Sequence, residues 1–240
     1  MHRFMAWAAL IFLAIPSGVL AHGVWVAERA GDPTIIFGHG ARDYAYEPEK
    51  VTAVIGITAL GDKIKLERAA TKKNVTLVVP STVVAIAMNF DNGFWIRKAD
   101  KQWVVGGKQQ APGGRDSHHA VKYSTHVVSK LAGPLKPTGA ALEIIPLQDP
   151  LSLKAGAVLP VQVLLLGKPL RNVRLEADYV NRAGDKTAAK TDSNGRVGVR
   201  IANEGLNVLA VEFDQKTPSD PNVDVVSHLA TLSFVLPHKD

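Results

Sequence analysis

Short apolar stretches separated by turn-forming residues run along the whole chain. In the first half they are rich in β-branched residues, which favour strands, and they span 34–37, 51–57, 75–79, 83–87 and 121–128. Turns are predicted between them at Gly31-Asp32-Pro33, Gly61-Asp62 and Asp91-Asn92-Gly93. No segment keeps an apolar period of 3.6 residues over three turns, so the pattern does not predict a helical bundle.

The second half has its own set of predicted strands, which span 158–166, 171–181, 196–201, 207–213 and 228–236. The pair Asn194-Gly195 fits a tight turn that requires positive φ. Between the halves, segment 131–139 holds two prolines and two glycines, which continue neither helix nor strand. We therefore predict an all-β fold with two tandem immunoglobulin-like β-sandwich domains, over 22–135 and 140–238.

Residues 1–21 have the pattern of a secretory signal peptide. A weakly basic start is followed by an apolar run over 4–15, and Val19 and Ala21 place small side chains at the third and first positions before a cut. A membrane-spanning helix needs about twenty apolar residues, and this run is shorter. We predict export to the periplasm, with no integral membrane segment after cleavage. The alternative is an uncleaved N-terminal anchor.

Composition narrows the possible chemistry. The chain has no cysteine, which excludes thiolate metal sites, cysteine nucleophiles and disulfides. Its 28 basic residues exceed its 22 acidic ones only modestly, and they do not cluster with aromatic residues, so nucleic-acid binding is not expected. No Gly-x-Ser-x-Gly elbow and no His-Glu-x-x-His motif occurs. The sequence therefore predicts a protein that is not an enzyme.

The most informative position is His22, because cleavage after Ala21 would make it the first residue. Its free α-amine and its imidazole could then close on one metal ion as a chelate. Such nitrogen donors suit copper(II) and nickel(II), and zinc less distinctively. Both donors must lose their protons to bind, so the affinity is expected to fall in acid.

His39 is the predicted second ligand. Gly38 and Gly40 flank it and allow a tight backbone turn. Its spacing from His22 fits a strand, a turn and a returning strand, which would place the two histidines side by side. The alternative is an ordinary loop histidine.

Four further histidines are candidate metal ligands. His118 and His119 follow a polar, flexible loop over 111–117, where both could reach one ion; a solvated surface pair is the alternative. His126 lies on the more polar side of the strand predicted over 121–128, and His228 lies near the start of the last predicted strand. For both, a structural histidine is the alternative. His238 is expected to be part of the tail, and Trp25 is expected in the core.

Several short motifs resemble known families. Gly167-Lys168-Pro169-Leu170, Thr191-Asp192 and Gly195-Arg196-Val197 resemble the transthyretin-like or carboxypeptidase-regulatory-like β-sandwich module. Together with His22-Gly23-Val24-Trp25, Phe37-Gly38-His39 and the stretch 142–147, they make the whole chain after the signal similar to the bacterial DUF4198 family. That resemblance implies a periplasmic protein linked to nickel or cobalt uptake, with a membrane metal transporter as its partner.

From these observations we predict a periplasmic protein that binds a transition-metal ion through His22, His39 and at least one later histidine. Nickel is the first choice on the resemblance alone, and copper, cobalt and zinc are alternatives. One competing hypothesis is an exported interaction or adhesion module that binds no metal. Another is a copper histidine-brace oxidase, which the absence of an evident surface cluster of Trp or Tyr argues against.

Overall fold

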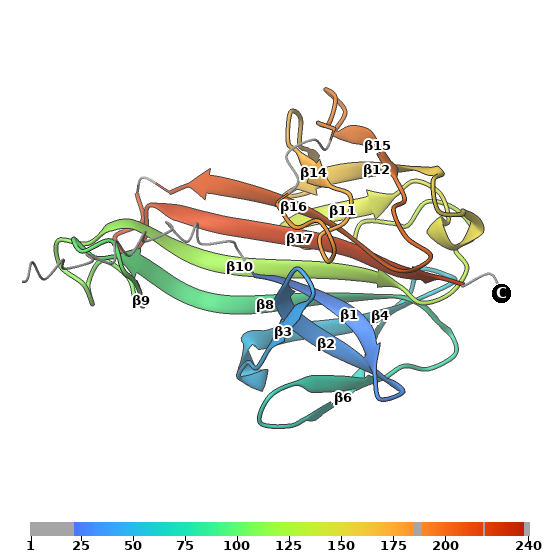
Figure 1. Cartoon of the computed structure of the whole chain (residues 1–240), viewed down its shortest axis with the longest axis horizontal. Helices are drawn as coiled ribbons and strands as arrows, with labels where there is room; N and C mark the ends of the chain where they lie inside the picture. The colour runs from blue at the N-terminus through green and yellow to red at the C-terminus, as the bar shows by residue number, and fades with distance from the viewer. Residues whose placement is uncertain (1–21, 185–188, 218, 238–240) are drawn as a thin grey trace, which may run out of the picture.

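The computed structural model describes residues 22–184, 189–217 and 219–237. The predicted signal segment 1–21 and His238 lie outside these ranges. The described chain is built from strands arranged in three sheets, which confirms the predicted all-β sandwich class. The largest sheet, called sheet B, lies in the middle. Of the two smaller sheets, sheet A covers part of one face of sheet B, and sheet C packs against the other face (Figure 1).

Sheet B has the strand order β14-β16-β17-β10-β8-β4-β5, with β9 paired to β8. Its strands are β4 (Val51–Thr58), β5 (Lys63–Lys65), β8 (Val83–Arg97), β9 (Trp103–Val105), β10 (Arg115–Val127), β14 (Leu175–Glu176), β16 (Gly205–Lys216) and β17 (Val225–Leu236). Four of them, β8, β10, β16 and β17, are long enough to extend past sheet A at one end (Figure 1). That uncovered end of sheet B carries the cavity described below.

The two outer sheets are smaller. Sheet A contains β1 (Gly23–Arg29), β2 (Asp32–His39), β3 (Arg42–Tyr44), β6 (Glu67–Ala70) and β7 (Val75–Val78). Sheet C contains β11 (Leu142–Pro146), β12 (Val158–Leu165), β13 (Lys168–Pro169) and β15 (Arg196–Arg200). The described helices are the short 3-10 turns η1 (Pro48–Lys50) and η2 (Pro150–Ser152). Within the described residues no helix has the length and apolar character needed to cross a membrane.

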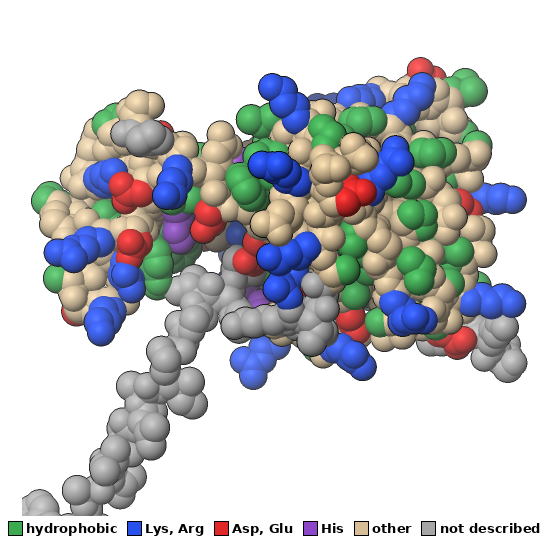
Figure 2. Space-filling view, turned by 90° about the horizontal axis from the view of Figure 1, so that it is seen from above, with side chains coloured by type: hydrophobic (Ala, Val, Ile, Leu, Met, Phe, Trp, Pro, Cys, Tyr) green, Lys and Arg blue, Asp and Glu red, His purple; other side chains and the backbone are tan. Residues whose placement is uncertain are grey.

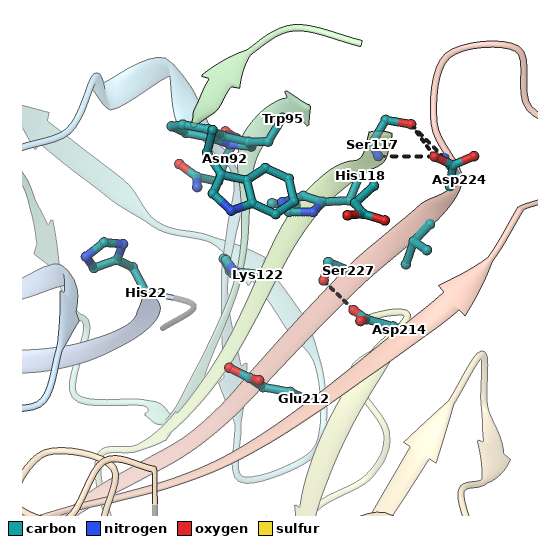
Figure 3. Close-up of a pocket in the computed structure, with 14 residues that line it drawn as sticks. His22, Asn92, Trp95, Ser117, His118, Lys122, Glu212, Asp214, Asp224 and Ser227 are labelled. Carbon is teal, nitrogen blue, oxygen red and sulfur yellow. Dashed lines mark hydrogen bonds between the residues drawn. The ribbon is translucent and has the colours of Figure 1, made fainter. Parts of the chain in front are cut away.

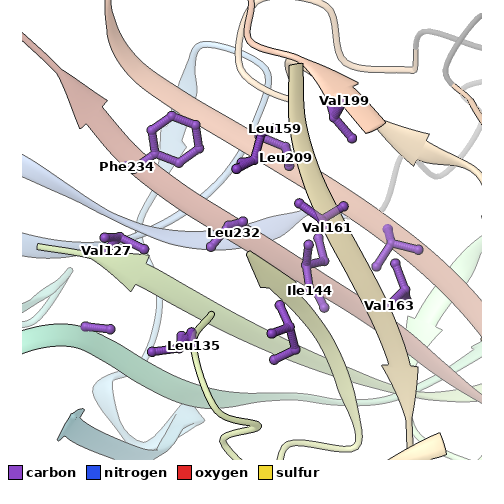
Figure 4. Packing of buried hydrophobic residues seen from close by; sticks show 14 of the residues in the cluster. Val127, Leu135, Ile144, Leu159, Val161, Val163, Val199, Leu209, Leu232 and Phe234 are labelled. Atoms are coloured by element: carbon purple, nitrogen blue, oxygen red, sulfur yellow. The ribbon is translucent and has the colours of Figure 1, made fainter. Parts of the chain in front are cut away.

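Sheet B is apolar on both faces because a sheet packs against each of them. On β8, Ile86 and Met88 point into the core shared with sheet A, whereas Ala85 and Ala87 point into the core shared with sheet C. Side chains alternate between the faces of a strand, so a strand covered on both sides reads as a continuous apolar run. The core between sheets B and C includes Phe234, which is fully buried (Figure 4).

Strands from both predicted domains join in sheet B. In the middle of the sheet β10 pairs with β17 in parallel, from His118↔Val225 to Val127↔Phe234. The predicted boundary at 131–139 is an irregular connection. It is tied to β11, because the buried carboxylate of Glu143 accepts hydrogen bonds from the backbone N–H and the hydroxyl of Thr138. The division into two domains stays a prediction, because the central sheet takes strands from both sides of it.

Two local predictions were wrong. Segment 91–93 is not a turn but part of β8, where the register against β10 shifts and Gly93 has a φ of 80°. A bulge absorbs these turn-forming residues without ending the strand. Segment 171–181 forms only the two-residue strand β14 plus one isolated bridge. The predicted turn with Asn194-Gly195 is present, and Gly195 has a φ of 70°.

Candidate metal centre and the adjoining cavity

His22 and His39 lie at the open end of the hairpin formed by β1 and β2. The strands pair in antiparallel register from Arg29↔Asp32 to Gly23↔Gly38, so the two histidines follow directly after the last pair. The turn is formed by Ala30 and Gly31, both with positive φ, one residue earlier than predicted. The predicted arrangement of strand, turn and returning strand is therefore confirmed.

The two imidazole rings are close and nearly perpendicular. Their centroids are 6.4 Å apart and their planes meet at 89°. Gly38 is needed at this position, because a Cβ there would lie 2.2 Å from the carbonyl oxygen of Arg42 and 2.8 Å from the Trp25 ring. This glycine lets β2, β3 and the buried Trp25 approach one another, and so it fixes where His39 leaves the hairpin.

Aromatic rings surround both histidines. The His22 ring lies 4.6 Å from the ring of Tyr44 and 5.1 Å from that of Phe37, and His39 lies 5.6 Å from Tyr179. Trp25 is 1% exposed, so the prediction that it fills the core is confirmed. These contacts hold each imidazole in place by packing, which leaves its ring nitrogens as the polar part of the site.

The surroundings keep both imidazoles in the form that binds metal ions. Burial lowers the pKa of His22 below its usual range, and the charges of His39 and Lys122 lower it further. Burial also lowers the pKa of His39. Both rings are therefore mostly neutral at pH 7, with a lone pair free for coordination.

The geometry of the two rings is compatible with both binding one ion. A metal–nitrogen bond is about 2 Å long, so imidazoles on opposite sides of one ion have ring centres about 6 Å apart. The observed 6.4 Å fits that arrangement. Among the described residues no three His, Asp or Glu side chains come together as a metal-binding group. A third nitrogen at this site would have to come from the amine of residue 22, which exists only after cleavage.

A cavity of about 550 Å³ opens beside His22. It lies over the end of sheet B that sheet A leaves uncovered, and Figure 2 shows histidine side chains in a hollow with charged side chains near it. Its lining includes the side chains labelled in Figure 3, which come from β8, β10, β16, β17 and the residue just before β17: Asn92, Trp95, Ser117, His118, Lys122, Glu212, Asp214, Asp224 and Ser227. Trp103 on β9 also lines the cavity.

Lys122 is the unusual residue of this cavity. Its side chain is only 3% exposed, and burial lowers its pKa to about 8, while Glu212 and Asp214 act in the opposite direction. Burial raises the pKa of Glu212, and Lys122 counteracts that rise. The cavity thus holds one buried cation beside the candidate metal ligand His22, and Glu212 and Asp214 are two of the four carboxylates that line it.

The prediction that His118 and His119 follow a loop on which both could reach one ion was wrong. Both lie on β10, where they point to opposite faces of the sheet. Pairing with β8 and β17 keeps this part of the chain extended. His118 faces the cavity, 4.8 Å from the ring of Trp103. His119 stacks on Phe94 at 4.4 Å, and its Nε2 lies 2.8 Å from a carboxylate oxygen of Asp91. The two rings therefore cannot reach one ion from this strand.

His126 and His228 are held by other partners. His126 lies on β10, as predicted, with its Nδ1 2.9 Å from the hydroxyl of Ser233, and burial lowers its pKa to about 4. His228 lies on β17, 5% exposed and 3.1 Å from the hydroxyl of Tyr123, on the opposite face of sheet B from Lys122. Neither residue lines the cavity.

The sequence alone does not point to the other polar and aromatic groups of this cavity as site residues: Lys122, Glu212, Asp214, Trp95 and Trp103. One signal was present: Lys122 alternates with apolar residues on a predicted strand, on the same side as His126. Glu212 lies in a strand predicted to end at 213, Asp214 lies just beyond that end, and the tryptophans lie beyond the predicted turn at 91–93. Only the length of β8 and β16 brings these residues over one face of sheet B.

Comparison with known proteins gives two matches. The model of a domain of unknown function, DUF4198, matches residues 19–215. An uncharacterised protein of Haemophilus influenzae is 24% identical over 208 residues, which cover 85% of this chain and 86% of that protein. No solved structure matches.

Proposed function

The chain belongs to the DUF4198 family, and we propose that it binds a divalent transition-metal ion at a site formed by His22 and His39. In this proposal the chain is exported and cut after Ala21. The new α-amine and the near ring nitrogen of His22 chelate the ion, and one ring nitrogen of His39 binds it from the other side. The site is a binding site and carries out no reaction.

The observation that carries the proposal is the placement of the two imidazoles. Two histidines that are 17 positions apart in sequence lie 6.4 Å apart at the end of one hairpin, with burial favouring their neutral forms. Packing against Tyr44, Phe37 and Tyr179 limits how far the rings can move. A preorganised pair of this kind loses little side-chain entropy when an ion binds.

The site also suits reversible binding. Two imidazoles and an amine leave part of the coordination sphere to water or to another ligand, and His22 opens onto a cavity. An ion held in this way can be exchanged, which is what a periplasmic carrier for a membrane transporter requires. Nickel is the proposed ion, with cobalt, copper and zinc as the ions to compare, since nitrogen donors alone favour copper.

The test is calorimetric titration of the protein beginning at His22 with nickel, copper, cobalt and zinc chlorides. Replacing His39 with alanine removes one of three donors, and we expect the affinity to fall about tenfold to a hundredfold. His119→Ala is the matched control, because that ring pairs with Asp91 on another face of the sheet. Equal affinities for wild type and His39→Ala would overturn the proposal.

The pH dependence of metal affinity is a separate prediction. An α-amine titrates at about pH 8, so near neutrality one proton competes with each ion, and the affinity should fall about tenfold per pH unit. The imidazoles join this competition only below their lowered pKa values. The slope should therefore steepen only at a pH below the ordinary imidazole pKa of about 6.5, as dissociation constants measured from pH 8 to pH 5 will show. A constant affinity between pH 6 and pH 8 would contradict participation of the amine.

A further inference from the structure

We propose that the cavity beside His22 binds a free α-amino acid, with the ligand's carboxylate on Lys122 and its ammonium group between Glu212 and Asp214. This site adjoins the metal centre, because His22 lines both, but its charged groups come from β10 and β16. Figure 3 shows Lys122 between His22 and Ser227, with Glu212 and Asp214 along the adjacent wall.

Lys122 is a buried cation on the wall of this cavity. Its side chain is 3% exposed, and within the described part of the chain its ammonium group has no hydrogen bond and no ion pair at contact distance. Glu212 and Asp214 stabilise its charge only from a longer distance, and burying a charge without a direct partner is costly. An anionic group bound in the cavity would provide the missing partner, and a carboxylate does so with a charge-assisted hydrogen bond.

The carboxylates of the cavity are not equivalent. Asp116 is paired with Arg97, and Asp224 is paired with Lys108 at 2.6 Å. The other two lining carboxylates, those of Glu212 and Asp214, form no ion pair at contact distance among the described residues, and Lys122 acts on them only from a longer distance. Asp214 accepts a hydrogen bond from Ser227, which orients it. Glu212 forms neither a hydrogen bond nor an ion pair there, so it is available to a bound ammonium group.

These charges together select a zwitterion. A ligand with two or more negative charges would face repulsion from Glu212 and Asp214, and a simple amine would leave Lys122 without a partner. An α-amino acid carries one group of each sign on adjacent atoms. A free amino acid thus satisfies both sides of the cavity, which neither a dicarboxylate nor an amine can do.

The rest of the cavity provides apolar contact. The rings of Trp95 and Trp103 line it, and Trp103 packs against His118 at 4.8 Å. The Nε1 of Trp95 donates to the backbone oxygen of Asn92, so this ring is held in place. A volume of about 550 Å³ lies in the range of small-molecule pockets and leaves room for a side chain against the indoles.

The test is carried out on the protein beginning at His22, in buffer containing EDTA so that no metal contributes. Each of the twenty standard amino acids is screened by thermal shift, and we expect at least one to raise the melting temperature. For that amino acid, calorimetry then compares its methyl ester, which lacks the anion, and its deaminated acid, which lacks the ammonium group. Each change should weaken binding about tenfold or more.

The matched variants are Lys122→Met, which keeps the length of the side chain but removes the charge, and Lys130→Met, an exposed lysine beyond the end of β10. Lys122→Met should lose about tenfold or more in amino-acid affinity, and Lys130→Met should lose none. The proposal is overturned if no amino acid shifts the melting temperature, if Lys122→Met binds equally well, or if the deaminated acid binds as tightly as the amino acid.

Two variants separate this site from the metal centre. His39 does not line the cavity, so His39→Ala should lose metal affinity and keep amino-acid affinity. Lys122→Met should show the reverse. If Lys122→Met were poorly folded, the ester and the deaminated acid would still test the proposal on the wild-type protein.

Discussion

One alanine added in front of His22 is expected to weaken metal binding about a hundredfold or more. The addition turns the terminal amine into an amide nitrogen, which cobalt(II) and zinc(II) do not deprotonate at neutral pH, and it moves the free amine away from the ring. For these ions the chelate is thereby lost, although His22 and His39 both remain. Calorimetric titration of the two proteins with cobalt and zinc measures the effect.

The control for this prediction is the fold itself. His22 precedes the first pair of the ladder, Gly23↔Gly38, so one more residue in front of it breaks no strand pairing. The extended protein should therefore melt at the same temperature without metal as the protein beginning at His22. If both forms bind cobalt and zinc equally, the amine is not a ligand. Mass spectrometry showing a different first residue in the exported protein would remove the premise.

The pairing of His22 with His39 was predictable because it depends on local structure. A strand of seven residues, a two-residue turn and a strand of eight residues return the chain to its starting point, and the glycines around His39 are visible in the sequence. In contrast, the cavity depends on contacts between distant strands. Lys122 and Glu212 are ninety positions apart, and they share one cavity only because β17 lies between β10 and β16.

The strands themselves were mostly predictable, but the sheet that joins the two halves was not. Apolar runs of β-branched residues mark β4 and β8 in the sequence, because these strands have buried positions on both faces. Which strands pair is not encoded in such runs. The parallel pairing of β10 with β17 brings together segments about a hundred residues apart, and no turn signal connects them.

Replacing Phe90 with alanine is expected to reduce the free energy of unfolding by about 3–5 kcal/mol. Phe90 is fully buried on β8, stacked on Phe37 at 5.0 Å and packed edge-on against Tyr46 at 5.4 Å. Its removal leaves a cavity between sheets A and B that the surrounding rings can fill only partly. Urea unfolding of variant and wild type, with the midpoint and slope compared, gives the change in free energy.

Phe94→Ala is the matched control, since it removes the same side chain from the same strand at a position that is 39% exposed. Its cost should stay below about 1 kcal/mol, because no enclosed cavity forms. Phe90→Ala should also weaken metal binding. The ring of Phe37 stacks on Phe90, and its centroid lies 5.1 Å from that of the His22 ring, so loss of Phe90 removes support from His22. Similar stabilities for the two variants would mean that the core between sheets A and B is not packed as described, and that the two imidazoles are not held by it.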